Sequence, residues 1–148
     1  MNEAVIRPFA PEDAPGVRDL SVRITEEDVL YGQVAETAEE ILAFDRRFFF
    51  VAEAGREIVG CVAGREAKAH EICIMPEGER YLEVEAIYVW SDCRGGGLGS
   101  KLLDRLMAAA REHGITRFRV YTAAKDFDRI VGFYRSHGFK TWYTELFI

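Results

Sequence analysis

The chain has 148 residues, of which 49% are hydrophobic and 30% are charged, and its formal net charge is −6. This length and composition predict one globular domain spanning residues 1–148. No apolar run is longer than Phe48–Ala52, which is far below the roughly 18 residues that cross a bilayer, so we expect no membrane partner and a cytoplasmic location. An acidic chain lacks the basic face that phosphate contacts need, which argues against a nucleic-acid partner. Three cysteines without a CxxC spacing and three histidines without ligand spacing predict neither a disulfide framework nor a metal site.

The net negative charge of the chain comes entirely from its first third. Residues 1–50 contain 11 acidic and 5 basic side chains, whereas residues 51–148 contain 14 of each. The segment Ile24–Glu40 has six carboxylates and no basic residue. Such a segment creates a local negative field that attracts cations. The alternative interpretation is a solvated helix face.

The first two thirds of the chain predict two helices and four strands. Strands are expected over Val5–Pro8, Arg47–Ala54, Glu57–Gly64 and Tyr81–Trp90, with a hairpin turn at Ala54–Arg56. A helix is expected over Ala14–Ile24, because Pro11–Asp13 supplies residues typical of a helix start. A second, acidic helix is expected from its cap Thr37 to Phe44.

The last third predicts helices and strands in alternation. From Leu98, apolar residues recur at helical spacing until His113–Gly114. A strand over Arg117–Tyr121, a helix over Asp126–His137 and a final strand over Gly138–Ile148 follow. Together these elements predict an α/β (α+β) fold with a mixed, partly parallel central sheet and helices on both faces.

A glycine-rich segment joins the Tyr81–Trp90 strand to the helix that begins at Leu98. Glycines at that place let a ligand approach the backbone, and the free N–H groups of a helix start favour an anion such as a diphosphate. A Walker A loop needs Gly-Lys, but Ser100 separates Gly99 from Lys101, and the dinucleotide fingerprint needs glycine at position 100. A purely structural tight turn is the alternative.

The run Arg94-Gly95-Gly96-Gly97-Leu98-Gly99 resembles the Arg/Gln-x-x-Gly-x-Gly/Ala signature of the GNAT superfamily of N-acetyltransferases. The stretch Ile130–Phe139 resembles the second motif of that family, a helix with Tyr134 four residues before Gly-Phe. The resemblance covers nearly the whole chain and implies a GNAT-like fold and acetyl-CoA as cofactor. The implied cofactor contacts are the strand end and the turn, at Ile87, Tyr88, Val89, Arg94, Gly95, Gly96, Gly97, Leu98, Gly99 and Ser100.

The sequence departs from the family pattern at three places. Phe127 stands where the family often has an asparagine that reaches the cofactor arm, and Ser91 replaces a common proline at the turn. The tail after Gly138 has room for one full strand rather than the usual two. Either the sheet ends early, or a second copy of the chain completes it in a homodimer.

Acetylation of an amine by a thioester needs a base for the ammonium and a proton for the departing thiolate. The resemblance implies Glu85 as the base; Glu83, on the same face by the period-2 rule, is the second candidate. The alternative is that both carboxylates are exposed or paired with Arg80 or Arg119. The resemblance implies Tyr134 as the general acid; a core tyrosine is the alternative. The developing oxyanion is expected to take a backbone N–H from Ile87–Val89.

The resemblance also places the first two helices and their connection on one wall of the acceptor pocket. We therefore expect Glu26, Glu27, Asp28 and Tyr31 to contact a cationic primary amine, and an aminoglycoside-like small molecule is the favoured acceptor. Two alternatives stay open: a protein or peptide acetyltransferase, and a non-catalytic acyl-CoA-binding module.

Overall fold

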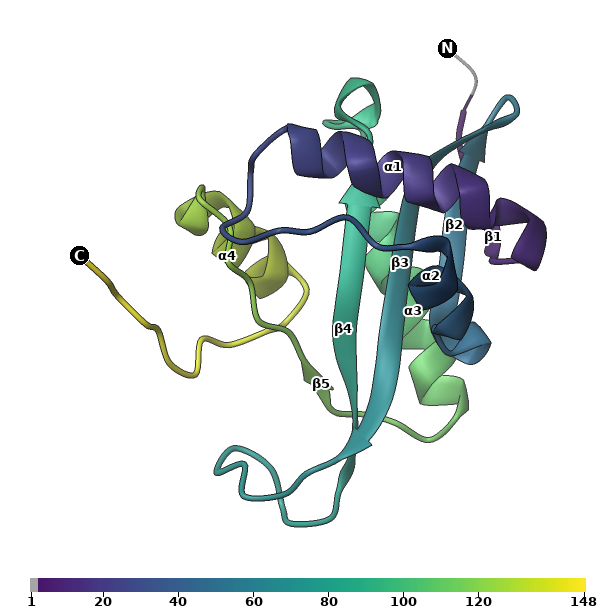
Figure 1. Cartoon of the computed structure of the whole chain (residues 1–148). Coiled ribbons are helices and arrows are strands. Elements are labelled where there is room, and N and C mark those ends of the chain that lie inside the picture. Colours follow the sequence, from purple (N-terminus) through teal and green to yellow (C-terminus); the bar gives the residue numbers. More distant parts are fainter. Residues whose placement is uncertain (1–2) are drawn as a thin grey trace.

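In the computed structural model, which describes residues 3–148, one five-stranded sheet lies between two layers of helices (Figure 1). The strands are β1 (Val5–Pro8), β2 (Phe49–Ala54), β3 (Glu57–Lys68), β4 (Arg80–Val89) and β5 (Phe118–Arg119), and their spatial order follows the sequence. The pairings of β1 to β4 are antiparallel, and β5 is parallel to β4. The expected mixed, partly parallel sheet is confirmed.

Helices cover both faces of the sheet, as expected. The helices α1 (Ala14–Glu26) and α2 (Ala38–Ala43) lie on one face, and α3 (Leu98–Glu112) lies on the other (Figure 1). Thr37 caps α2 as predicted, since its hydroxyl accepts the N–H of Glu40 at 3.2 Å. The helix α4 (Phe127–Ser136) adds Tyr134 to the core on the α3 side. The β4–β5 side of the sheet therefore contacts both α3 and α4.

Two apolar clusters hold these layers together. On one face, Val17 and Leu20 of α1 pack with Val51 and Cys61 of the sheet. On the other, the apolar stripe of α3 packs on apolar residues of β2, β3 and β4. The stripe contains Leu102, Leu103 and Leu106, which are fully buried. Burial of this stripe, at about 25 cal/mol per Å² of apolar surface, fixes α3 and hence the turn that precedes it.

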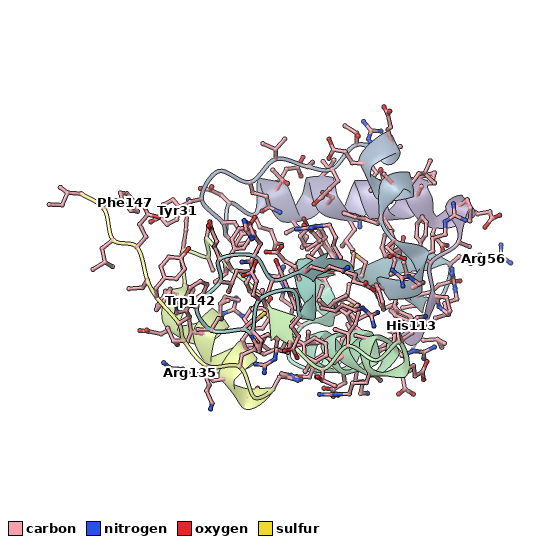
Figure 2. All side chains as sticks on the ribbon, turned by 90° about the horizontal axis from the view of Figure 1, so that it is seen from below. Tyr31, Arg56, His113, Arg135, Trp142 and Phe147 are labelled. Carbon is pink, nitrogen blue, oxygen red and sulfur yellow. The ribbon has the colours of Figure 1, made fainter. Side chains whose placement is uncertain are left out.

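The predicted final strand over Gly138–Ile148 is wrong. No residue of this segment pairs with a strand in the described chain, and β5 is shorter than the predicted Arg117–Tyr121. Instead the tail runs away from the sheet (Figure 1), and Trp142 and Phe147 lie along its outer part with Tyr31 beside Phe147 (Figure 2). The tail has strand-forming residues, but it does not follow the outer edge of β5, so its backbone finds no ladder to join.

A β-bulge interrupts β4 at Glu85. Ala63 of β3 pairs with Ala86, whereas the next residue, Gly64, pairs with Val84, so Glu85 is the extra residue on β4. A bulge leaves the extra residue without a direct partner and changes the side-chain alternation beyond it. Glu85 thus stands at the one irregular position of the longest pairing in the sheet.

No helix among residues 3–148 is both long enough and apolar enough to span a membrane.

Candidate functional site

The short strand β5 pairs only with the beginning of β4. Leu82 pairs with Phe118 and Glu83 with Arg119, and β4 then continues to Val89 with no strand on that side in residues 3–148. The N–H of Trp90 donates to Val59 on β3, so by strand alternation Ile87 and Val89 direct their backbone groups to the open side. The end of β4 therefore offers hydrogen-bonding groups to an extended ligand, at the residues predicted to hold the cofactor arm.

The glycine turn follows directly at the end of β4. Gly95 and Gly97 have φ angles of 87° and 81°, a left-handed conformation that glycine adopts without strain. A Cβ built on Gly95, Gly96 or Gly97 would meet no atom within 4 Å, so the turn faces open space. The first N–H groups of α3 have no partner within the helix, and with the N-terminal end of the helix dipole they favour an anion. The turn is thus open, positively polarised and free of side chains.

Arg94 connects this turn to two neighbouring elements. Its Nε donates to the carbonyl of Val89 at 2.9 Å, and its two terminal nitrogens donate to the carboxylate of Glu27 at 3.0 and 2.6 Å. The guanidinium therefore ties the turn to the end of β4 and to the end of α1. Glu27, which was predicted to contact the substrate, is engaged here as a partner of the predicted cofactor residue Arg94.

The remaining predicted substrate residues do not line the cavity next to Glu85, which is described below. Asp28 forms an ion pair with Lys125 at 2.8 Å. The Nζ atom of the same lysine lies over the ring of Tyr31, 5.3 Å from the ring centroid. Glu26 is exposed. Their contact with a substrate stays a prediction.

A cavity of about 510 Å³ lies between α2 and the strands β3 and β4. Four carboxylates and one guanidinium are its charged groups, and its full lining is Glu36, Glu40, Ala43, Phe44, Asp45, Gly64, Arg65 and Glu85. The Arg47 guanidinium holds the pKa of the Asp45 carboxyl below its usual range, so Asp45 is ionised at neutral pH. The cavity is therefore acidic, as the charge distribution of the sequence suggested, although the predicted residues are not the ones that line it.

Arg65 contacts both candidate bases. Its Nε donates to Glu85 at 2.6 Å, and one terminal nitrogen donates to Glu83 at 2.7 Å. Glu83 is only 3% exposed and also accepts from Arg119 at 3.1 Å. The Glu85 carboxylate raises the pKa of the Arg65 guanidinium above its usual value. Glu83 is thus the enclosed partner of two arginines, whereas Glu85 reaches the cavity.

Glu36 is the carboxylate in this cavity with the most neutral partners. It accepts from the hydroxyl of Tyr88 at 2.6 Å and from the hydroxyl of Ser21. Burial raises the pKa of Tyr88 above its usual value, and the hydrogen bond to Glu36 is the second largest cause of this shift. Tyr88, a predicted cofactor residue, therefore faces α1 and anchors the connection between α1 and α2.

Tyr134 lies on α4 with its ring buried against Phe133 and Phe139. Burial raises the pKa of Tyr134 to about 12, so the phenol keeps its proton at neutral pH. Its hydroxyl makes no hydrogen bond within the described residues and is not among their fully enclosed polar atoms. The hydroxyl of Tyr134 therefore keeps a hydrogen that it can donate to a ligand.

Phe133 connects α4 to the turn. Its ring lies 3.7 Å from the position of a Cβ built on Gly99, an ordinary van der Waals distance, so α4 packs directly on the start of α3. Phe127 is 44% exposed at the start of α4, where the family pattern often has asparagine.

Comparison with known proteins agrees with this geometry. The model of the family described as "Acetyltransferase (GNAT) family" matches residues 15–139. The chain belongs to the GNAT acetyltransferase family. The family resemblance noted in the sequence is therefore confirmed.

A curated relative, an "IAA acetyltransferase" of Azospirillum brasilense, is 35% identical over 91 residues. The match covers 62% of this chain and 53% of the relative, so the chain spans about half the length of the curated relative it matches.

Solved structures share the fold over nearly the whole chain. One is a predicted acetyltransferase with acetyl-CoA from Clostridium acetobutylicum, with a TM-score of 0.70, 20% identity, and coverage of 97% of this chain and 95% of that one. Another is an aminoglycoside 6′-N-acetyltransferase from Acinetobacter haemolyticus, with a TM-score of 0.71, 15% identity, and 97% and 96% coverage. A third is a ribosomal-protein-alanine N-acetyltransferase from Brucella melitensis, with a TM-score of 0.71, 21% identity and 99% coverage of both chains.

Proposed function

We propose that this protein transfers the acetyl group of acetyl-CoA directly to a primary amine of a cationic small molecule, and that an aminoglycoside-like compound is the favoured acceptor. The observation that carries the proposal is that β4 joins two sites. The open turn Gly95–Gly97 begins beyond its end, and Glu85 of the same strand lines the acidic cavity. Four residues of strand, about 13 Å, separate Glu85 from Val89.

The residues of the turn and of the β4 end suit acetyl-CoA. The backbone of Arg94–Ser100 holds the diphosphate, and the open side of Ile87–Val89 pairs with the pantetheine arm. The same backbone offers an N–H to the oxyanion that forms as the amine attacks the thioester. The presence of acetyl-CoA in the Clostridium acetobutylicum structure supports this assignment.

The charge of the cavity supports a cationic acceptor. Glu36, Glu40 and Asp45 attract an ammonium group, and this attraction also favours its protonated form. At pH 7, removing a proton from an alkyl ammonium with a pKa of about 10.4 costs roughly 4.6 kcal/mol. A positioned base is therefore required, and Glu85 fills this role directly or through a water molecule. Tyr134 is the general acid, which donates its phenolic hydrogen toward the thiolate as the carbon–sulfur bond breaks.

The experiment is a thiol-release assay with acetyl-CoA and a panel of amines. The panel contains an aminosugar, a linear polyamine, a basic peptide, and neutral and anionic primary amines. We expect the highest kcat/KM for the small cationic amines. A preference for neutral or anionic acceptors contradicts the cation proposal, and absence of acetyl transfer together with absence of CoA binding contradicts the enzyme assignment.

A matched pair of variants links this preference to the cavity. Glu40 lines the cavity and its neighbour Glu39 on α2 does not, although both are exposed. We expect Glu40→Gln to raise KM for a cationic amine several-fold and Glu39→Gln to leave it unchanged. Equal effects of the two substitutions contradict a role of the cavity in acceptor binding.

The second candidate is acetylation of a protein or peptide amino group. It is favoured by the fold shared with the ribosomal-protein-alanine N-acetyltransferase. The peptide in the panel distinguishes it, because a peptide acetyltransferase prefers the peptide to the aminosugar and the polyamine.

The proposal includes a homodimer in which a second copy completes the sheet. Each copy has an unpartnered outer edge at β5 within the described residues, and a tail whose Tyr143, Leu146 and Phe147 are exposed. Each copy therefore supplies an open edge and a tail that can pair with the open edge of the other copy. Sedimentation velocity is expected to show a dimer that Leu146→Lys weakens, and a wild-type monomer at assay concentrations contradicts the proposal.

A further inference from the structure

A hydrogen-bonded chain of three side chains connects α4 to the start of α3. His137, which follows α4, places Nε2 3.0 Å from the hydroxyl of Ser100 and Nδ1 3.0 Å from the carboxylate of Asp104. Ser100 and Asp104 lie one helical turn apart on α3, and the His137 side chain between them is 10% exposed. The ring of Phe133 packs on the imidazole at 5.1 Å. The imidazole is thus held in one position next to the glycine turn.

The partners determine which nitrogen carries the proton. The Asp104 carboxylate only accepts hydrogen bonds, so Nδ1 of His137 carries a hydrogen and donates it. In the neutral ring Nε2 is then an acceptor, and the hydroxyl of Ser100 donates to it. The hydroxyl proton of Ser100 is therefore committed to His137 when no ligand is bound.

Few charged groups face this imidazole. Asp104 is the one carboxylate within 4 Å of it in residues 3–148. Lys101 and Arg105 are each about 100° around α3 from Ser100 and Asp104, and Arg105 lies over the ring of Phe50. Protonation of His137 thus places a cation between Asp104 and the anion site.

A bound phosphate group reverses the direction of the hydrogen bond between Ser100 and His137. Phosphate oxygens only accept hydrogen bonds, so Ser100 must withdraw its proton from His137 to donate to a diphosphate on the turn. The bare Nε2 would then face a hydroxyl lone pair, which is repulsive. If the ring takes a proton from solvent, Nε2–H donates to Ser100, Ser100 donates to the phosphate, and the carboxylate of Asp104 balances the new charge.

We propose that binding of the coenzyme diphosphate is coupled to uptake of a proton by His137, which acts through Ser100 as a positioning residue of the cofactor site. This inference rests on the proposed function, since it requires the diphosphate at the turn. By linkage, cofactor affinity decreases as pH rises, by at most about tenfold per pH unit for one proton.

Titration calorimetry measures this coupling. The probe is 3′-dephospho-CoA, because it keeps the diphosphate and lacks the phosphate monoester that itself titrates near pH 6. Binding at pH 7.5 is measured in two buffers with different enthalpies of ionisation, and the difference gives the number of protons taken up. We expect net uptake with dephospho-CoA and none with pantetheine, which lacks the diphosphate.

Two histidine variants locate the proton. His137→Asn is expected to abolish the uptake and to make the affinity for dephospho-CoA independent of pH between 6 and 8. His70→Asn is the control, because His70 lies in an exposed loop and pairs with Glu77. Uptake that persists in His137→Asn, or wild-type binding without uptake, overturns the inference and leaves the proposed function intact.

A spectroscopic measurement covers the case in which His137→Asn does not fold. The ring nitrogen shifts of His137 in the wild-type chain at pH 7.5 are expected to change from those of a neutral ring to those of an imidazolium when dephospho-CoA is added. An unchanged neutral ring in the saturated complex overturns the inference. Absence of any binding of CoA or dephospho-CoA by folded protein contradicts the proposed function instead.

Discussion

Replacement of Tyr134 by phenylalanine separates the catalytic interpretation of this residue from the structural one. The ring is 9% exposed and packs with Phe133 and Phe139, and phenylalanine keeps these contacts. The hydroxyl has no protein hydrogen bond among the described residues, so its removal breaks none. We expect the free energy of unfolding to change by less than about 1 kcal/mol.

The expected loss of rate follows from the acid strength of the phenol. General acid catalysis contributes about 10²- to 10⁴-fold, or roughly 3–5 kcal/mol of activation free energy. Burial raises the pKa of Tyr134 to about 12. This pKa is higher than that of a thiol, about 8.5, so complete transfer of the proton from the phenol to a free thiolate is uphill. The contribution then comes from hydrogen bonding to the thiolate as the carbon–sulfur bond breaks. We therefore expect a kcat loss at the lower end of the range, about 100-fold.

The assay compares kcat, the Kd for CoA and the melting temperature of Tyr134→Phe with those of the wild type. Tyr143→Phe is the matched control, because Tyr143 lies exposed on the tail. The Kd for CoA is expected to stay within about twofold, since the reaction and not cofactor binding requires the acid. A kcat within threefold of the wild type refutes the acid role, and a parallel loss of CoA binding shows that the hydroxyl acts in binding.

Three other substitutions test the site and the fold. Glu85→Gln is expected to slow the reaction mainly at lower pH, where little neutral amine is available, and a flat ratio to the wild type across the pH–rate profile assigns the base elsewhere. Gly97→Ala places an L-residue at a φ of 81° and is expected to cost about 1 kcal/mol of stability, read as a lower melting temperature, and to weaken CoA binding; an unchanged affinity contradicts the role of the turn. Arg7 lowers the pKa of the Asp13 carboxyl, so Asp13 stabilises the fold above the unfolded value of 3.8 and loses this contribution as pH falls further. In urea unfolding, Asp13→Asn is expected to cost about 1–3 kcal/mol at pH 7 and much less at pH 3, and an equal cost at both contradicts this linkage.

Local patterns predicted most of the secondary structure. The helix from Leu98 has an apolar stripe at helical spacing, and the strand from Tyr81 is rich in β-branched and aromatic residues. The tail after Gly138 has a similar strand composition, yet it forms no strand. A strand needs a partner edge as well as propensity, and whether β5 extends far enough to offer one is set by tertiary structure.

The functional residues divide in the same way. The glycine turn was predictable because its residues are adjacent in sequence, and the carboxylates Glu36 and Glu40 belong to the acidic segment recognised there. Arg65 carried no signal, because its contacts with Glu83 and Glu85 come from the register between β3 and β4. The contact of His137 with Ser100 likewise depends on how α4 packs against α3.

The bulge at Glu85 shows how one local irregularity makes the proposed chemistry compatible with the core. By strict alternation, Glu83 and Glu85 would share a face with Ile87 and Val89. In the structure Ile87 and Val89 pack on the α3 side with Leu82, whereas Glu85 lines the cavity beside α2. The extra residue changes the alternation, so the same strand buries apolar side chains under α3 at both its ends and presents carboxylates to the other face in between. A regular β4 would have placed either these carboxylates in the core or Ile87 and Val89 in the cavity, and either arrangement would cost several kcal/mol.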